Sequence, residues 1–284
     1  MTFDYFTAFE RNIGWVAEAE QGQLRNKRVA IAGMGGVGGF HLLTLARLGI
    51  SRFAIADLDT FELPNFNRQA GALMSTLGRP KVDVLAEMAR DINPLCELEV
   101  FPDGVHDGNI ERFFRDIDLY VDGLDAFAFA ARETVFAYCA KRNIPAITVA
   151  PLGMSAALVN FLPGRMTFEQ YFQLDGCSEL EKAIRFLVGL APSLQHRHYL
   201  IDRTKVNLAE RRGPSTVTAC QLCAGVAAAE AFKILIGRGK VRTAPHAFQF
   251  DAFRNRLAHT WRPGGNRHPL NQLAIAIAKR QLGI

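Results

Sequence analysis

Residues 28–39 read RVAIAGMGGVGG, an apolar run that ends in a cluster of glycines. The run from Val29 to Ala32 predicts a short buried strand, and the glycines allow a tight turn into a helix that we expect to continue to about Leu48. Free backbone N–H groups at the start of a helix attract an anion, and glycines let phosphate oxygens approach closely. The pattern predicts a phosphate-binding turn that contains Gly33, Gly35, Gly36 and Gly38.

A second apolar run, Arg52 to Ala56, ends in Asp57, about one βαβ unit after the glycine turn. A carboxylate at this place can accept hydrogen bonds from the hydroxyls of a ribose. The same spacing occurs in nicotinamide-dependent dehydrogenases. These two runs therefore predict a nucleotide without specifying which one.

Strand and helix patterns alternate up to Ala150, which predicts an α/β fold with a Rossmann-like doubly wound sheet whose first half is parallel. Ligands bind at the carboxyl ends of the strands in such folds. Asp57 and Asp122 both follow expected strands, so we expect them to share one crevice with the glycine turn. The expected elements are a helix at 81–93, a strand at 97–101, a short helix at 109–114, a strand at 119–122, a helix to about Arg142 and a strand at 146–149.

The pattern changes after Pro151, where we expect antiparallel strands in the C-terminal part. A strand is expected at 156–162, a helix from the capping residues 215–218 to Gly237, and a final hairpin near Phe248 and Leu257. We expect a single domain over 1–284. Its parts are a helical lead-in (1–27), a nucleotide-binding half (28–150), a second half (151–261) with an insertion at 166–212, and a basic C-terminal tail (262–284) that ends in an amphipathic helix.

The composition favours a protein of the cytoplasm. With 284 residues and 49% hydrophobic content, the chain can bury one substantial core. Asp4, Glu10 and Arg11 interrupt the N-terminal stretch where a signal peptide needs an apolar core, and Glu230 interrupts the most apolar later run, so no membrane span is expected. Five cysteines, an odd number in a long chain, favour reduced thiols.

The positive charge is concentrated at the C-terminal end. From Arg238 onward the chain has nine Lys/Arg and one acid, Asp251, which gives this part a net charge of +8. The whole chain has +5, so the remainder has −3. A basic tail can attract a phosphate-rich partner such as tRNA, although solvated cationic surfaces are common without any such partner.

Four spaced elements follow the glycine turn, and together with it they resemble the ThiF/MoeB/E1 superfamily. Members of that superfamily adenylate the carboxylates of ubiquitin-like proteins and related substrates. The resemblance covers roughly residues 9–150 and the helix at 219–237. It is carried by Asp57-Leu-Asp59, Asn65-x-x-Arg68-Gln69, Arg79-Pro80-Lys81 and Asp122-x-x-Asp125.

The residue types in these elements suit the binding of ATP. Arg68 and Lys81 supply positive charge for the β- and γ-phosphates. Asp125 can hold Mg²⁺, which keeps several waters and needs only one or two protein carboxylates. The resemblance implies that Asp57 binds the ribose, Asp125 the magnesium, and Arg68, Lys81 and Asn65 the triphosphate.

Further polar residues are expected around the same nucleotide. Asn65 and Gln69 provide neutral donors that orient phosphate oxygens. Asp59 is either a turn residue or a support for the site, and Asp122 either contacts the ligand or orients a loop. The resemblance implies that Arg11 reaches across a dimer interface to the γ-phosphate, so we expect a homodimer.

The cysteines depart from the family pattern. Many members bind structural zinc through two Cys-x-x-Cys pairs, whereas this chain has one, Cys220-Gln-Leu-Cys223, and tetrahedral zinc needs four ligands. We therefore expect no zinc. Cys177 lies where some members carry a thioester-forming cysteine, but neighbouring acids are expected to raise its pKa, and all three cysteines are weak candidates. His196 and His198 are expected to be exposed.

The leading hypothesis is an ATP-dependent adenylyltransferase. The substrate carboxylate, ionised at neutral pH because its pKa is about 4, attacks the α-phosphorus and pyrophosphate leaves. The protein's task is positioning and charge neutralisation. The carboxylate belongs to the C-terminus of a ubiquitin-like protein or peptide, or to a small acid.

Three alternatives remain open. The branch that dehydrates tRNA threonylcarbamoyladenosine resembles residues 11–150 about as well, and the basic tail suits RNA. A non-catalytic scaffold subunit is a second alternative, against which stands the joint presence of Arg68, Lys81 and Asp125. A dehydrogenase is the third.

Overall fold

Residues 2–208, 210–282 and 284 are described by a computed structural model. The chain forms two compact units, the first made of Met1–Leu124 and Ala224–Val241 and the second of Asp125–Cys223 and Arg242–Ile284. Positions 1, 209 and 283 of the expected lead-in, insertion and tail lie outside the described residues. The single domain expected over 1–284 stays a prediction.

The first unit contains four parallel strands in the order β3-β2-β1-β4. β1 and β4 are buried along their whole length, as expected for a parallel sheet covered on both faces. Ala32 pairs with Ala56 on one side and with Asp122 on the other, so three strands end at the same edge. The strands are β1 (Arg28–Ala32), β2 (Arg52–Ala56), β3 (Glu97–Phe101) and β4 (Leu119–Asp122).

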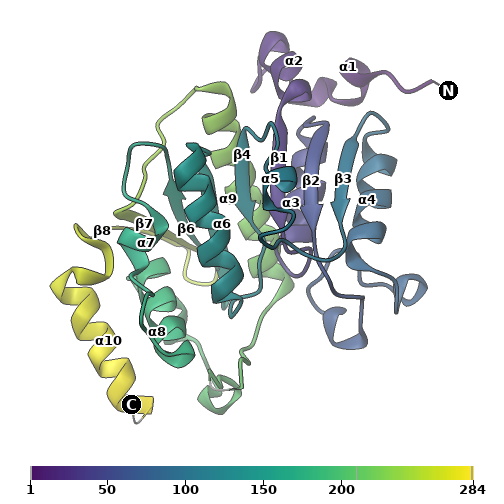
Figure 1. Cartoon of the computed structure of the whole chain (residues 1–284). Helices are drawn as coiled ribbons and strands as arrows, with labels where there is room; N and C mark the ends of the chain where they lie inside the picture. Colours follow the sequence, from purple (N-terminus) through teal and green to yellow (C-terminus); the bar gives the residue numbers. More distant parts are fainter. Residues whose placement is uncertain (1, 209, 283) are drawn as a thin grey trace. The chain divides into compact units, whose positions relative to one another are not determined.

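Helices α3 and α4 pack against each other and beside these strands (Figure 1). In α4, the buried Val82, Leu85, Ala86 and Ala89 recur at helical spacing and form its inner face. The lead-in is attached through Tyr5, whose hydroxyl donates to the carbonyl of Gly49 (2.7 Å). The helices are α1 (Tyr5–Ala8), η1 (Glu10–Asn12), α2 (Glu18–Asn26), α3 (Gly38–Arg47), η2 (Leu63–Asn65), η3 (Met74–Thr76), α4 (Lys81–Ile92) and α5 (Ile110–Phe113).

The second unit contains four antiparallel strands in the order β5-β6-β7-β8. All seven residues of β6 are buried, whereas β7 alternates between buried and half-buried residues and β8 is mostly exposed. The sheet therefore becomes more open toward β8. The strands are β5 (Ala146–Leu152), β6 (Ser155–Phe161), β7 (His246–Asp251) and β8 (Arg256–Trp261).

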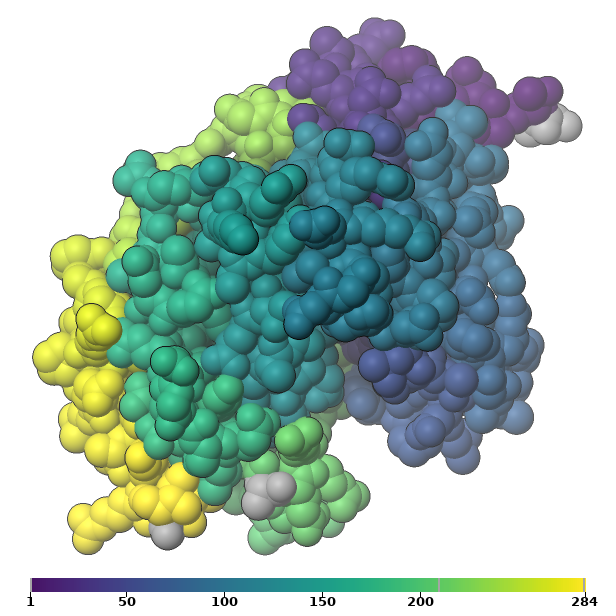
Figure 2. All heavy atoms as spheres, in the orientation of Figure 1, coloured from purple at the N-terminus to yellow at the C-terminus, as the bar shows by residue number. Residues whose placement is uncertain are grey.

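An aromatic cluster fills the core of the second unit. Phe168 stacks on Phe136 with ring centroids 4.5 Å apart, and Phe161, Phe172 and Phe186 surround this pair. The C-terminal helix α10 packs on α8 and lies at the molecular surface (Figure 2). The helices are α6 (Phe129–Arg142), α7 (Phe168–Phe172), α8 (Glu179–Leu190), η4 (Gln195–His198), η5 (Arg203–Lys205), η6 (Gly265–Arg267) and α10 (Pro269–Leu282).

Helix α9 (Val217–Ile236) contributes residues to both units. Contrary to the expectation that Glu230 interrupts this run too early, α9 is long and apolar enough by length and composition to cross a membrane. Its apolar window is 44% buried. Core helices of soluble proteins meet the same criterion, so this feature by itself does not indicate a membrane protein.

The α/β fold class is confirmed, with parallel strands in the first part of the chain and antiparallel strands toward the C-terminus. The expected helices and strands are found, with boundary shifts of a few residues. Two strands extend beyond the prediction: β5 continues from the expected Val149 to Leu152, and β6 begins at Ser155. These two strands form a hairpin across Gly153, a turn position whose φ is +65°.

Candidate functional site

The glycine turn after β1 is held by backbone atoms in direct contact. Gly33 has a φ of +89°, and its N–H donates to the carbonyl of Ala56 (2.7 Å). A Cβ atom on Gly33 would lie 2.1 Å from the carbonyl oxygen of Gly123, and one on Gly38 would lie 1.7 Å from that of Gly33. Only glycine fits at these positions, because the backbones of the two turns are in contact.

Asp57 organises this turn. Its Oδ2 accepts from the Met34 N–H (2.5 Å) and its Oδ1 from the Asp59 N–H (2.8 Å). These two hydrogen bonds are compatible with the predicted binding of a ribose by Asp57, because an ionised carboxylate has about four lone-pair sites. A role in shaping the turn was not expected from the sequence.

Lys81 carries a buried positive charge that is linked to the turn through Asp59 and Asp57. It is 5% exposed, opens α4, and its Nζ lies 2.9 Å from Oδ2 of Asp59, whose side chain is 58% exposed. The Lys81 N–H also donates to the carbonyl of Asp59 (3.0 Å). The ammonium group has three donors, so it can bind a phosphate oxygen while it keeps Asp59 as a partner.

The three polar residues after Asp59 have different surroundings. Oδ1 of Asn65 accepts from the Glu62 N–H (3.0 Å), and Arg68 donates to the carbonyl of Pro64 (3.1 Å). Gln69 is buried beside the glycine turn, because a Cβ atom on Gly35 would lie 3.7 Å from its Nε2. Oε1 of Gln69 is buried with no hydrogen-bond partner in the described part of the chain. The structure thus places Gln69 at the turn and gives Asn65 and Arg68 local partners.

Asp122 ends β4 and is buried. Its Oδ1 accepts from the Leu124 N–H (3.2 Å) and from the Tyr120 hydroxyl (3.3 Å). Asp122 therefore orients the turn whose Gly123 meets the glycine loop. His41 of α3, which no sequence pattern indicated, is fully buried, and burial lowers its pKa to about 4 against the opposing effect of the Asp122 charge.

Asp125 belongs to the second unit and is exposed at its surface. Its Oδ1 accepts from the Phe127 N–H (3.0 Å), and its carbonyl accepts from Nη2 of Arg132 (2.9 Å). The buried Arg132, also missed from the sequence, lies over the ring of Phe186 at 4.7 Å. Arg132 therefore fixes the backbone that presents the Asp125 carboxylate.

The donor set fits a weakly held magnesium ion rather than a zinc site. The described residues contain no group of three or more His, Cys, Asp or Glu that could hold a metal. An exposed carboxylate such as Asp125 is the kind of single protein ligand that Mg²⁺ accepts when substrate phosphates supply further oxygens. Magnesium at Asp125 and the lack of structural zinc stay predictions.

Arg11 is exposed in η1, and the neighbouring Asn12 anchors the segment. Nδ2 of Asn12 donates to Oε1 of Gln21 (3.1 Å) and to the carbonyl of Leu48 (3.4 Å). The backbone at Arg11 is thus fixed while its side chain lies in solvent. Its predicted contact with a neighbouring subunit stays a prediction.

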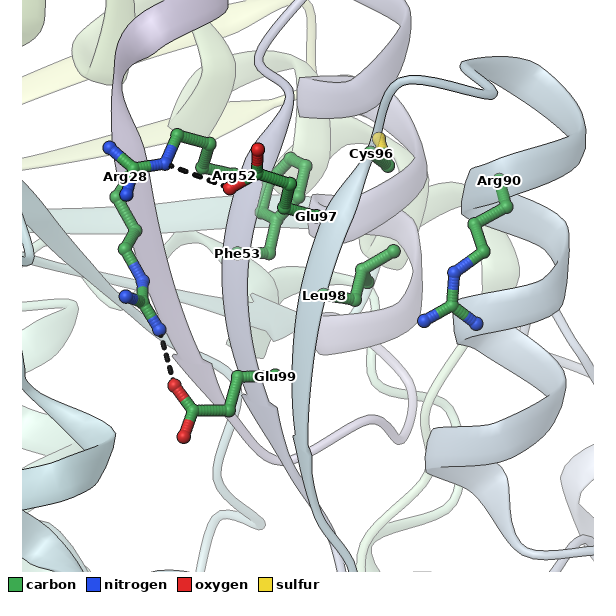
Figure 3. Close-up of a pocket in the computed structure, with 8 residues that line it drawn as sticks. All are labelled: Arg28, Arg52, Phe53, Arg90, Cys96, Glu97, Leu98 and Glu99. Carbon is green, nitrogen blue, oxygen red and sulfur yellow. Dashed lines mark hydrogen bonds and ion pairs between the residues drawn. The ribbon is translucent and has the colours of Figure 1, made fainter.

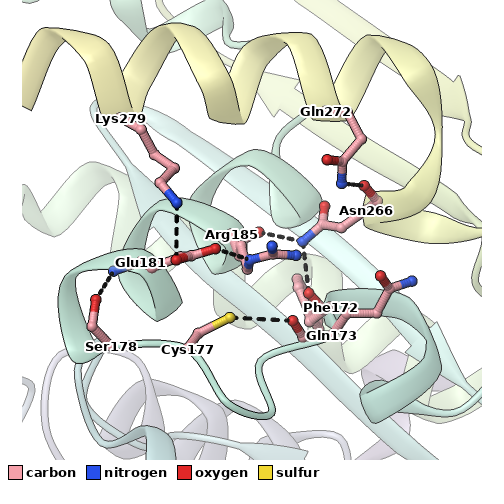
Figure 4. A network of polar contacts seen from close by, with 9 residues as sticks. All are labelled: Phe172, Gln173, Cys177, Ser178, Glu181, Arg185, Asn266, Gln272 and Lys279. Carbon is pink, nitrogen blue, oxygen red and sulfur yellow. Dashed lines mark hydrogen bonds and ion pairs between the residues drawn. The ribbon is translucent and has the colours of Figure 1, made fainter. Parts of the chain in front are cut away.

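The cysteines have raised pKa values where a shift is resolved. Burial raises the pKa of Cys96 to about 12 and the pKa of Cys223 well above its usual value. Burial is also the largest cause that raises the pKa of Cys177, whose thiol lies near the carbonyl of Gln173 in a network with Glu181 (Figure 4). These environments disfavour thiolates and hence thioester formation at these positions.

One histidine expectation was wrong. His196 is half-buried, and burial lowers its pKa to about 4; its Nδ1 lies 3.3 Å from Nε2 of Gln249. Gln249 also forms hydrogen bonds with Ser155 and Ser193, so His196 belongs to a cluster of polar residues around Gln249. The basic residues next to His196 in the sequence had favoured an exposed position. His198 is exposed, as expected.

A cavity of about 420 Å³ lies elsewhere in the first unit, beside β3 (Figure 3). Arg28 pairs with Glu99 (2.5 Å) and Arg52 with Glu97 (3.3 Å), so two of its guanidinium groups already have carboxylate partners. None of the predicted nucleotide-binding residues lines it. Its lining is Arg28, Arg52, Phe53, Arg90, Cys96, Glu97, Leu98 and Glu99.

The fold and the glycine turn together define a class of nucleotide-binding proteins. The model of the ThiF family matches residues 9–272, and the chain belongs to this family. The match extends past the nucleotide-binding half into the antiparallel strands and the start of α10.

Two curated relatives illustrate the range of similar proteins. The tRNA threonylcarbamoyladenosine dehydratase of Bacillus subtilis (strain 168) is 36% identical over 141 residues, which are 49% of this chain and 55% of that protein. Protein HesA, heterocyst, of Trichormus variabilis is 27% identical over 214 residues, 69% of this chain and 79% of that protein. The chain spans about half the length of the dehydratases it matches.

Solved structures share the fold over more of the chain. PaaA aligns with a TM-score of 0.69 at 20% identity, and the alignment covers 92% of this chain and 74% of the PaaA chain. E. coli MccB, solved with ATP, aligns with a TM-score of 0.62 at 19% identity, and the alignment covers 85% of this chain and 65% of MccB. At these identities the similarity establishes the fold alone.

Proposed function

We propose that the chain is an ATP-dependent enzyme that activates a carboxylate as an acyl-adenylate. The observation that carries the proposal is the close-packed glycine turn at the start of α3, which is linked through Asp57 and Asp59 to Lys81, whose buried charge lies 2.9 Å from the exposed Asp59 carboxylate. Backbone amides, a helix start and a buried ammonium together suit a polyphosphate. Membership of the ThiF family supports the same activity.

We propose further that the carboxylate belongs to a modified tRNA nucleoside of the threonylcarbamoyladenosine type. The dehydratase relatives, at up to 36% identity, support this substrate, and the basic C-terminal part of the chain suits RNA. In this reaction a carboxylate oxygen attacks the α-phosphorus, the bond to the α,β-bridging oxygen breaks, and pyrophosphate leaves. A nucleophile of the same nucleoside then attacks the acyl carbon, and AMP departs with the former carboxylate oxygen. The net change is loss of water.

The residues would divide the work as follows. Lys81 and Arg68 neutralise the β- and γ-phosphates, and Gln69 orients a phosphate at the turn with its buried amide. Asp57 binds the ribose while it holds the Met34 amide. Asp125 would hold Mg²⁺, and when bound the ion would neutralise charge on the leaving pyrophosphate. These roles come from chemistry and from the family resemblance.

A second candidate substrate is the carboxylate of a peptide, a small protein or a small acid. The fold shared with MccB, which has been solved in complex with MccA, covers 85% of this chain, whereas the match to the dehydratases covers about half. The segment at 166–212 lies outside the nucleotide-binding half and would select between these substrates.

Pyrophosphate release distinguishes the two substrates. We expect release from ATP and Mg²⁺ to depend on tRNA that carries threonylcarbamoyladenosine, and to fall at least about 100-fold in Asp125→Asn. Unmodified tRNA is the matched control. Release with a peptide carboxylate and none with the modified tRNA would support the second candidate, and lack of ATP binding would contradict both.

Thermal unfolding separates an ATP enzyme from a dehydrogenase or a silent scaffold. ATP with Mg²⁺ at about 100 times its dissociation constant should stabilise the fold by about 2.7 kcal/mol. NAD at the same concentration should have little effect. Stabilisation by NAD alone would favour a dehydrogenase, and stabilisation by neither would favour a scaffold.

A further inference from the structure

Asp125 stands in a short turn in front of α6. Its Oδ1 accepts from the Phe127 N–H (3.0 Å), and its carbonyl accepts from the Ala128 N–H (3.0 Å). α6 begins at Phe129, and Ala128 at the N-cap position has no side chain that could cap the helix. The place of the Asp125 carboxylate is therefore set by this turn and by the residues that hold the turn.

Arg132 holds the turn from inside the second unit. Its Nη2 donates to the same carbonyl of Asp125 (2.9 Å), which therefore has two donors. Arg132 is 2% exposed. Burial of a guanidinium is costly, and an apolar side chain would fill such a space at a lower cost. A buried arginine at this position therefore indicates that its contacts serve a purpose other than filling the core.

The Arg132 guanidinium also lies against α8. Its Cζ is 4.7 Å from the ring centroid of Phe186, within the range of a cation–π interaction. Phe186 is 6% exposed, and its ring meets that of Phe129, the first residue of α6, at 5.9 Å. One aromatic ring of α8 therefore contacts both the start of α6 and the arginine that holds the Asp125 turn.

A second contact between α6 and α8 lies next to Arg132 in the sequence. Nζ of Lys182 on α8 lies 2.6 Å from Oε2 of Glu133 on α6. The two side chains are 16% and 26% exposed, so salt screens this pair less than it screens an exposed one. Two consecutive residues of α6, Arg132 and Glu133, are thus attached to α8 within one compact unit.

We propose that Arg132 is a positioning residue that links α8 to the Asp125 carboxylate. Phe186 places the guanidinium, and the guanidinium places the carbonyl of Asp125. Loss of a group that orients a metal ligand typically lowers metal affinity about 10- to 100-fold. The inference rests on the proposed function, because it needs Asp125 to hold Mg²⁺. It adds that α8, part of the segment at 166–212 that would select the substrate, also sets the position of the magnesium ligand.

The gain in ATP affinity that Mg²⁺ confers tests this role without turnover. Calorimetric titrations with ATP in EDTA and with ATP and Mg²⁺ measure the gain. We expect Arg132→Met, which keeps most of the buried volume, to lower the gain about 10-fold and to leave the affinity in EDTA unchanged. Arg132→Lys, which keeps a charged donor, should recover part of the gain. A role in packing alone would lower both affinities together, and that result would overturn the proposal.

Phe186→Leu tests the link to α8, because it leaves Arg132 and Asp125 unchanged. It should lower the magnesium gain, and the double variant with Arg132→Met should lose little more than Arg132→Met alone, since both changes break one chain of contacts. Phe161→Leu is the matched control, because Phe161 is also 6% exposed and its ring contacts are with α6 and α7. This control should keep the wild-type gain. A wild-type gain in Phe186→Leu would overturn the link to α8.

Asp125→Asn separates this inference from the proposed function. If Asp125→Asn loses the magnesium gain while folded Arg132→Met keeps it, Arg132 has no positioning role and the magnesium role of Asp125 remains. If the wild type shows no gain, or Asp125→Asn keeps it, the magnesium assignment fails and the inference fails with it. Should Arg132→Met not fold, Arg132→Lys and Phe186→Leu decide, and wild-type gains in both would overturn the proposal.

Discussion

At the scale of single residues, the contacts among Gly33, Gly38 and Gly123 give the sharpest prediction. Gly38→Ala places a Cβ atom 1.7 Å from the carbonyl oxygen of Gly33, so the turn must shift. We expect a loss of about 2 kcal/mol in the free energy of unfolding and loss of ATP binding. Urea unfolding and calorimetric titration with ATP measure the two effects.

A matched control for Gly38→Ala exists in α2. A Cβ atom on Gly22 would have no neighbour within 4 Å, and Gly22 lies in the interior of the helix. Gly22→Ala should therefore stabilise by about 0.5–1 kcal/mol and leave ATP binding unchanged. Equal stability of the two variants would show that the glycine contacts are not as close as described.

Lys81 gives a prediction about binding rather than folding. Lys81→Met keeps most of the buried stem but removes the charge beside Asp59, so ATP affinity should fall at least about 10-fold. Arg79→Met is the control, because Arg79 pairs with Glu87 at the exposed start of the same segment. Isothermal titration would contradict the assigned role if both variants bound ATP equally well.

His41 should make stability depend on pH. Its folded pKa of about 4 lies below the ordinary value of 6.5, so the unfolded chain binds a proton first as the pH falls. The wild type therefore loses stability between about pH 6.5 and pH 4, by up to about 3 kcal/mol from this residue. His41→Leu should remove that loss, since both ring nitrogens are buried without a hydrogen-bond partner among the described residues.

Unfolding of His41→Leu and wild type at pH 7.5 and pH 4.5 measures this difference. The gap between the two proteins should widen at the lower pH. The exposed His198→Leu serves as the control and should follow the wild type. A gap that stays constant with pH would mean that His41 is protonated in the folded protein.

At the scale of elements, the sequence predicts strands better than it predicts side-chain partners. Runs such as 52–56, 97–101 and 119–122 became strands at those residues, because a short apolar run bounded by turn residues is a local property. The contact between Asp57 and the Met34 amide joins two turns that are 23 residues apart in the sequence, so no local sequence pattern predicts it. Arg132 and His41 were missed for the same reason.

α10 is attached to α8 by apolar contacts of Ile275 with Ile184 and Val188 and by one carboxylate, Glu181. Glu181 accepts from Lys279 (3.0 Å) and Arg185 (2.9 Å), and these hydrogen bonds lower its pKa (Figure 4). A lowered folded pKa means that the contribution is complete above the ordinary Glu pKa and is lost as the pH falls through the folded pKa. Glu181→Gln should destabilise by about 1 kcal/mol at pH 7, and the difference should vanish at acidic pH.

Glu179→Gln is the matched control for this network, because Glu179 pairs with Arg211 at an exposed position two residues earlier. It should change the unfolding midpoint by less than Glu181→Gln at every pH. If the two variants had equal midpoints at pH 7, the network would contribute nothing to the attachment of α10.

At the scale of the whole molecule, the sequence predicts the phosphate-binding turn better than it predicts the segment that we propose selects the substrate. The phosphate-binding turn follows from glycine spacing, because that geometry admits few residue types. The segment at 166–212 forms α7 and α8, whose buried aromatic residues pack in the core of the second unit. Substrate identity is therefore a property that sequence patterns in this segment do not express.

The dimer expectation leads to a test of the complete enzyme. If Arg11 acts on the γ-phosphate of a neighbouring subunit, Arg11→Ala and Asp125→Ala should each be inactive, yet their mixed dimer contains one site with both residues intact. Equal mixing gives half mixed dimers, so about a quarter of all sites should regain pyrophosphate release. Mixing Arg11→Ala with Arg11→Ala,Asp125→Ala is the control and should stay inactive. Differential tagging should verify that mixed dimers have formed. If these dimers recover no pyrophosphate release, Arg11 does not act on the site of a neighbouring subunit. Arg11 then either belongs to the same site as Asp125 of its own chain or has no part in catalysis, and its exposed side chain on a fixed backbone serves the fold alone.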